Sequence, residues 1–470
     1  MTEPVGSRAA HAFDVALLAA VAVLVGWQLF IPPVLSVANE GDFQKLAARV
    51  CVRTEPGIDH FDYATVHWTI APDGCAEWPY HTSAELVMRA AVALNRFAGF
   101  APSFDTRWVG ALYTVLLLAC CAWAQWLLRG ARPWTSRVLQ MAFAIAICNA
   151  VYIPMLNTFF FDPMAMVMMV GAVAGMAAML LRDEVDGKTL AGTALAFALV
   201  AAAKGQHSLL ALVCLPAFWI KRGRRVFPPV WARVAATLAV IAGAAVSLGT
   251  TPLYQTGEVT YNALFFRILP HVSNPAAYLA ETRLPARYLS AVGTHSYQEN
   301  SPNGTEAQQE AFARMFGVKD LALLYLRHPA SAWWMMKIDL DEASIDRVRM
   351  KIGEKEYRLG NYERSIGKPP QSLSHFFGLW PAVKGSAISG HPRRYFVLIL
   401  AVIAAAWLLA PRWPGMRWLL GMYTAILVVA FAVVMIDGTD AGRHMQMFNY
   451  LLDLLVCGVA ALIAERVALG

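Results

Sequence analysis

Long runs of apolar residues, separated by polar stretches, dominate the pattern of this chain. Several runs approach or exceed the roughly 20 residues that a helix needs to cross a bilayer. The pattern predicts ten crossings, at Val15–Val37, Trp108–Leu128, Val138–Met155, Pro163–Leu181, Leu190–Ala203, Ser208–Ile220, Val234–Thr250, Tyr395–Leu409, Trp418–Ile436 and Met445–Ile463. We therefore expect an all-α polytopic membrane protein with about ten transmembrane helices.

The fifth and sixth crossings are short, and the tetrapeptide 204–207 joins them. A single helix over 190–220 would be far longer than a bilayer is thick. We therefore expect two helices, with the chain turning round at Lys204. The first crossing lacks the small-residue cleavage site of a signal peptide, so we expect it to be retained.

Composition agrees with this class. The chain is 58% hydrophobic and 15% charged, with a mean hydropathy of +0.47, whereas soluble proteins carry about 25% charged residues. Lysine and arginine are enriched in the short loops 129–137, 182–188, 221–233 and 411–417, and are sparse in the short loops 157–162, 204–207 and 437–444. By the positive-inside rule both termini are cytoplasmic. We read the net charge of +7 as this topological signal, with no nucleic acid as partner.

Two long segments, 38–107 and 251–394, then lie on the extracytoplasmic side. The predicted organisation is an N-terminal transmembrane module at 1–250, which includes the segment 38–107, an extracytoplasmic loop domain at 251–394 and a C-terminal three-helix module at 395–470. Apolar residues recur at helical spacing over 43–50 and 84–97, which predicts amphipathic helices at the membrane surface.

Cysteines offer one structural hypothesis. Cys51 and Cys75 both fall in the first outer segment, and they would form a disulfide if that segment faces an oxidising compartment, or remain free thiols otherwise. The other five lie in apolar helices and are interpreted as packing residues. No metal-binding, P-loop or dinucleotide motif occurs, so the sequence indicates no cofactor and leaves a divalent metal ion open.

Acidic residues at the ends of the crossings are the first candidates for chemistry. Glu40 and Asp42 directly follow the first apolar run, and Asp162 precedes the fourth. Helix capping competes with function at Asp42 and Asp162, because each stands before a predicted helix. We favour function for Asp42, since two acids exceed what one cap needs, and both interpretations stay open for Asp162.

Basic residues on the same side are the second candidates. Lys204 and His207 lie at the outer end of the fifth and sixth crossings, where a snorkelling lysine and a phosphate-binding cation are both consistent with the sequence. Arg443 and His444 begin the last crossing. We favour phosphate binding for Arg443, because the guanidinium fork matches phosphate oxygens.

The last crossing also carries a polar stripe. Arg443, Gln446, Asn449 and Asp453 fall on one face of a helix. Such a stripe is costly against lipid, so it should face the interior of the bundle. For Asn449 and Asp453 a structural network between helices is the competing interpretation.

In their order these features resemble bacterial GT-C superfamily glycosyltransferases, in particular polytopic hexose transferases of surface-glycan assembly. The matching stretches are Asn39-Glu40-Gly41-Asp42-Phe43, 157–162 (NTFFFD), 261–266 (YNALFF) with Asn274-Pro275, 361–363 (NYE), and the run from Arg443-His444 to Asp453. Together they span most of the chain.

The resemblance implies the chemistry. Members of the superfamily take a sugar from a polyprenyl-phosphate carrier and typically use an acid of the first outer loop as base. By that resemblance Asp42 is the base, Glu40 the second choice and Asp162 a supporting acid. Such families commonly have Glu where this chain has Asp162. The substrate-binding residues would be Arg443, His444, Lys204, His207, Arg267, Asn262 and Tyr261.

We therefore expect a membrane glycosyltransferase of the bacterial inner membrane, with its active site on the periplasmic face. The donor would be a polyprenyl-phosphate-linked sugar, and the acceptor a glycan, a lipid or a protein. A transporter or lipid-linked glycan flippase is the alternative, although transporters usually show paired halves with broken helices. An O-antigen-ligase-like transferase would share the chemistry and differ in its donor.

Overall fold

The computed structural model describes residues 5–32, 34–37, 42–54, 66–76, 78–129, 133–221, 223, 226–299, 301–344, 349–352, 355–358, 377–411, 413–438 and 441–468. The predicted acid Glu40 and the stretch 361–363 lie outside the described residues. Several arginines of the basic loops, Arg132, Arg222, Arg224, Arg225 and Arg412, lie outside them too.

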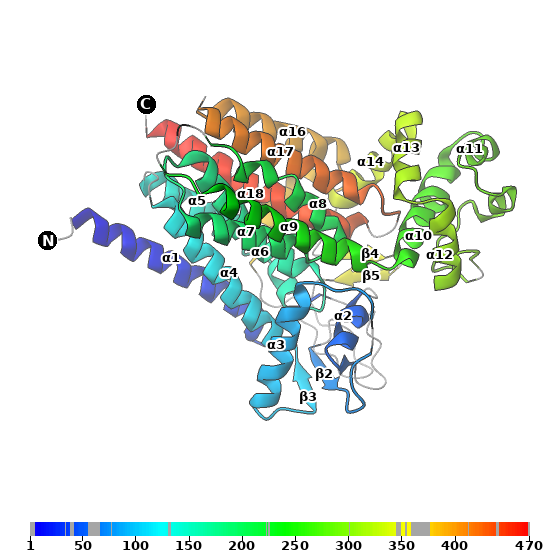
Figure 1. The fold of residues 1–470 in the computed structure, drawn as a ribbon, viewed down its shortest axis with the longest axis horizontal. Coiled ribbons are helices and arrows are strands. Elements are labelled where there is room, and N and C mark those ends of the chain that lie inside the picture. Colours follow the sequence, from blue (N-terminus) through cyan, green and yellow to red (C-terminus); the bar gives the residue numbers. More distant parts are fainter. Residues whose placement is uncertain are drawn as a thin grey trace.

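Seven helices among the described residues are long and apolar enough to cross a membrane. They are α1 (Val5–Phe30), α4 (Arg107–Leu128), α6 (Asp162–Leu181), α9 (Val230–Thr250), α16 (Pro392–Leu409), α17 (Pro414–Val434) and α18 (Ala441–Val467). Each overlaps a predicted crossing, although α1 ends at Phe30 and not at the predicted Val37, because Pro32 has no backbone N–H to continue the helix. Figure 1 shows these helices as a bundle with both termini at the same end. The prediction of an all-α polytopic membrane protein is confirmed.

The other three predicted crossings fall on shorter elements. The third is α5 (Pro133–Ala146) followed by the 3₁₀ turn η1 (Ile153–Asn157), the fifth is α7 (Gly187–Ala201), and the sixth is α8 (Gly205–Leu212) with the 3₁₀ turn η2 (Leu215–Phe218). The break after α5 has a local cause: the Asn149 side chain donates to the carbonyl of Ala146 and accepts from the amide of Val151. Such bonds offer the backbone an alternative to the helix.

The predicted turn at Lys204 is confirmed. Lys204 has an extended backbone and stands between the end of α7 and the start of α8. A parallel bridge pairs Glu184, before α7, with Val226, after η2. The chain therefore enters α7 at one end of the bundle, turns at Lys204 and returns to that same end before α9 begins.

The first outer segment, residues 38–107, folds at the end of the bundle away from the termini (Figure 1). It comprises α2 (Phe43–Arg49), β1 (Val52–Arg53), β2 (His67–Ile70), α3 (Ala84–Phe97) and β3 (Ser103–Asp105). The strands form an antiparallel sheet in the order β1-β2-β3, which the sequence did not predict. Cys51 and Cys75 form a disulfide, so the disulfide hypothesis is confirmed. Helices are present at both stretches that were predicted to be amphipathic, and their location at the membrane surface stays a prediction.

The second outer segment has its own small hydrophobic core, in which Tyr261, Phe265 and Phe312 pack ring against ring. Its elements are α10 (Leu253–Tyr261), the π-helix η3 (Asn262–Ile268), η4 (Leu269–His271), α11 (Pro275–Glu281), η5 (Ala286–Ala291), α12 (Glu306–Met315), α13 (Val318–Arg327), α14 (Pro329–Ser344), β4 (Arg349–Ile352), β5 (Lys355–Arg358) and α15 (Leu379–Ile388). Figure 1 shows α10 to α13 grouped at one end of the molecule.

The polar stripe of α18 faces the bundle interior, as predicted. Asp453 accepts from the Tyr152 hydroxyl at 2.7 Å and pairs with Lys384 at 3.0 Å. Asn449 accepts from the hydroxyl of Tyr395. These contacts tie α18 to α15, to α16 and to the segment after α5, so the structural interpretation holds for Asn449 and Asp453.

Candidate functional site

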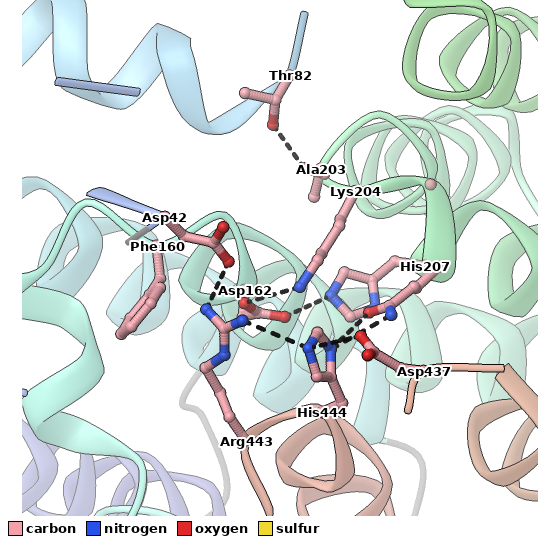
Figure 2. Close-up of polar contacts among 12 residues, drawn as sticks. Asp42, Thr82, Phe160, Asp162, Ala203, Lys204, His207, Asp437, Arg443 and His444 are labelled. Atoms are coloured by element: carbon pink, nitrogen blue, oxygen red, sulfur yellow. Dashed lines mark hydrogen bonds and ion pairs between the residues drawn. The ribbon is translucent and has the colours of Figure 1, made fainter. Parts of the chain in front are cut away.

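A cluster of charged side chains lies at the end of the bundle that carries the first outer segment (Figure 2). It is built from the residue before α2 and the first turn of α2, the first residue of α6, the turn before α8 and the first residues of α8, the loop before α18 and the first turns of α18. We call it the outer cluster, and its members are Asp42, Lys45, Asp162, Lys204, His207, Asp437, Arg443 and His444.

Asp42 is held between two cations. Its Oδ1 lies 2.7 Å from Nζ of Lys45, and its Oδ2 lies 2.5 Å from Nη1 of Arg443. Burial raises the pKa of Asp42, but the charges of Arg443, Lys45 and Lys204 outweigh it and hold the pKa well below its ordinary value. Asp42 occupies the N-cap position of α2, yet its side chain makes no capping hydrogen bond. The capping interpretation therefore fails for this carboxylate.

Asp162 joins α6 to the turn between α7 and α8. Its Oδ1 lies 3.0 Å from Nε2 of His207, and its Oδ2 lies 3.7 Å from Nζ of Lys204. The N-cap of α6 is Phe161, and Asp162 is already the first helical residue. The carboxylate is thus engaged with side chains from another helix, and the capping interpretation does not hold here either.

The first outer segment fixes the turn that presents Lys204. Thr82 Oγ1 donates to the carbonyl of Ala203 at 2.6 Å, and the amide of Ser83 donates to the carbonyl of Ala202 at 2.8 Å. The amide of Gly205 donates to the Tyr80 hydroxyl at 3.0 Å. These bonds satisfy backbone groups that the ends of α7 and α8 leave without partners.

Arg443 and His444 leave the start of α18 in the same direction (Figure 2). The guanidinium carbon of Arg443 lies 5.1 Å from the centre of the Phe160 ring, which is cation–π range. His444 Nε2 lies 2.9 Å from a carboxylate oxygen of Asp437, and Nδ1 lies within hydrogen-bonding distance of the Gln206 amide. Both side chains are therefore fixed by residues that surround the site.

The remaining predicted residues lie outside the outer cluster. Arg267 donates to the carbonyl of Gly438 at 2.7 Å and to Glu342 at 2.6 Å, so it braces the loop before α18. Tyr261 bonds Thr294 at 2.6 Å within the small core. Asn262 is buried and accepts from the amide of Ser296 at 2.8 Å.

The loop before α18 passes very close to Asn262. A Cβ on Gly438 would lie 2.1 Å from the amide nitrogen of Ala263, so glycine is needed for the close approach. Asn262 and Arg267 therefore help to position the loop that carries Asp437, and the structure does not bring them to Asp42 or Asp162.

Sequence reasoning missed two charged residues near Asp42. Lys45 lies one helical turn after Asp42, a spacing that could have identified it. Glu258 comes from α10, accepts a hydrogen bond from the Tyr297 hydroxyl and interacts electrostatically with Lys45 and Asp42. Burial raises the pKa of Glu258 above its ordinary value, although Tyr297 and Lys45 lower it. No local pattern around Glu258 marks it.

Three cations, Lys45, Lys204 and Arg443, thus surround the carboxylates of Asp42 and Asp162. Cations that converge at the end of a bundle suit an anionic ligand such as phosphate. Among the described residues, no group of three or more His, Cys, Asp or Glu side chains is arranged to hold a metal ion.

Comparison with known proteins places the chain in a family. The model of the YfdI N-terminal transmembrane domain matches residues 7–469, which is nearly the whole chain. No curated protein and no solved structure matches the chain. Family and helices agree on a multi-pass membrane protein that contacts the lipid bilayer.

Proposed function

This chain belongs to the family of the YfdI N-terminal transmembrane domain, and we propose that it is a membrane glycosyltransferase. It would move a sugar from a polyprenyl-phosphate carrier to a glycan, lipid or protein acceptor. The proposal extends the resemblance of the sequence to GT-C glycosyltransferases. The observation that carries it is the outer cluster, where three cations and two carboxylates from distant parts of the chain meet at one end of the bundle.

The reaction needs the chemistry that these residues offer. The acceptor oxygen bonds to the anomeric carbon, the bond from that carbon to the phosphate oxygen breaks, and its electron pair leaves with the polyprenyl phosphate. Arg443 and Lys204 are proposed to stabilise the negative charge on the leaving phosphate. The proton of the acceptor hydroxyl passes to a carboxylate, for which we propose Asp42, with Asp162 in support.

Two observations support an extracytoplasmic site in the bacterial inner membrane. The first outer segment, which supplies Asp42, contains the Cys51–Cys75 disulfide, and disulfides persist in oxidising compartments. The basic residues Arg182, at the C-cap of α6, Lys188, at the start of α7, and Lys221, after η2, lie at the end of the bundle opposite the outer cluster. On the positive-inside rule that basic end is cytoplasmic, which leaves the outer cluster at the periplasmic face.

Analysis of the lipid carriers tests the function. Cells that lack the protein should accumulate one polyprenyl-phosphate-linked sugar while one surface glycan loses that sugar. Wild-type protein and the control variant Asp73→Asn, whose carboxylate pairs with exposed Arg53, should restore both. Asp42→Asn, expressed at the same level, should not. An unchanged carrier pool and unchanged glycans in the deleted cells would contradict the proposal.

A further inference from the structure

The Asp42 carboxylate holds two of the cations that a donor phosphate would use. Arg443 and Lys45 each contact one of its oxygens, at 2.5 Å and 2.7 Å. The side chains of Arg443 and Asp42 are only 10% and 14% exposed, so little water competes for these contacts. A phosphate presents its oxygens to guanidinium and ammonium groups in the same way as a carboxylate does.

The other carboxylate of the cluster is differently placed. Asp162 contacts His207 and lies 3.7 Å from Lys204. Of the two acids, therefore, Asp42 holds Arg443, the cation best suited to phosphate. The phosphate of a lipid-linked sugar is a diester with one negative charge, the same charge as a carboxylate, so a bound donor competes with Asp42 for the same cations. When the sugar leaves, the carrier phosphate becomes a monoester with about −1.5 to −2 charges and is then the stronger competitor.

We propose that Asp42 is a resident anion, which occupies Arg443 and Lys45 until the phosphate of a lipid-linked donor displaces it. This inference rests on the proposed function, and it adds an order to the reaction. The donor phosphate enters first, and only then is the Asp42 carboxylate free to meet an acceptor hydroxyl.

The displacement would also change the basicity of Asp42. In the free protein burial raises the pKa of Asp42, and the charges of Arg443, Lys45 and Lys204 lower it more strongly. A bound phosphate would neutralise much of that positive charge, and Glu258 adds negative charge nearby. The pKa of Asp42 would then rise, and a carboxylate with a higher pKa is the better proton acceptor.

Binding of a carrier analogue to the purified full-length protein tests the displacement without any sugar transfer. The probe is farnesyl phosphate, titrated calorimetrically into detergent-solubilised protein. Asp42→Asn removes the competing charge and should bind the probe about fivefold more tightly than the wild type, the factor that corresponds to an ion pair of about 1 kcal/mol. A residue that simply contacts the ligand would give weaker binding when changed.

Two further variants secure this test. Asp42→Ser should show the same tightening, because Ser is neutral and tolerated at an N-cap position, and it serves if Asp42→Asn does not fold. Asp73→Asn removes the same charge from the same outer segment, where it pairs with Arg53, and should bind like the wild type. Melting temperatures of the same samples show whether each variant is folded.

The outcomes separate the inference from the proposed function. Unchanged or weaker binding in both folded Asp42 variants would overturn the displacement, whether or not the protein transfers sugar. Tighter binding in a protein that transfers no sugar would support the displacement and contradict the proposed function. Inorganic phosphate should bind the wild type more weakly than farnesyl phosphate, and equal affinity would overturn the assignment to a lipid-linked donor.

Discussion

The burial of Asp339 in α14 predicts how the stability of this protein depends on pH. The side chain is 1% exposed, and neither carboxylate oxygen has a hydrogen-bond partner among the described residues. Burial raises the pKa of Asp339, Glu342 and Asp437 raise it further, and Arg267 opposes them, with the result at about 8. Replacing Asp339 by Asn keeps the shape of the side chain and removes its ionisation.

The sign and size of the effect follow from that pKa. The value of about 8 exceeds the ordinary 3.8 by about 4 units, and each unit corresponds to about 1.4 kcal/mol. Between these two pH values the folded protein holds a proton that the unfolded chain has lost, so the free energy of unfolding falls as the pH rises. The loss has a ceiling of about 6 kcal/mol, and structural relaxation around the carboxylate will reduce it.

Thermal unfolding of the purified protein from about pH 5 to about pH 9 measures the part of this loss that occurs above pH 5, about three of the four units. The melting temperature of the wild type should fall across the range by more than that of Asp339→Asn, so that the gap between them widens toward alkaline pH. Asp341→Asn, at an exposed position two residues later in α14, should follow the wild type. Parallel curves for the wild type and Asp339→Asn would refute the reasoning.

Three other predictions concern the site and the topology. Arg443→Lys should weaken farnesyl phosphate binding in part and Arg443→Ala roughly tenfold or more, because a hydrogen-bonded charge is lost; normal affinity in Arg443→Ala would end its role as a phosphate ligand. Because the pKa of Glu258 is raised, its carboxylate should take up a proton at acid pH and sugar transfer should decline there. Glu258→Gln should remove this decline, and an unaltered pH profile would exclude Glu258 from the reaction. A single cysteine at Ser290 should react with an impermeant thiol reagent added to intact spheroplasts and one at Lys221 should not, whereas the reverse result would invert the proposed orientation.

The sequence by itself determined the class of the protein and most of its helices. A run of apolar residues long enough to cross a bilayer is a local property, so the seven long helices could be located without tertiary information. The turn at Lys204 followed from length alone, whereas the two cysteines of one outer segment made a disulfide a hypothesis that the structure then confirmed. Asp42, Asp162 and Arg443 could be singled out because each stands at the end of a predicted crossing, and all three fall on the same side of the predicted bundle.

Only the tertiary structure decided which of these residues act together. Asp42 and Arg443 are 401 residues apart and meet because the first outer segment and the start of α18 lie at the same end of the bundle. Glu258 has no distinctive neighbours in the sequence, and its raised pKa arises only because the fold buries it and places Asp437 and Asp42 nearby. Hydrophobic periodicity is set by each segment alone, whereas burial, charge pairing and pKa depend on neighbours that the fold supplies.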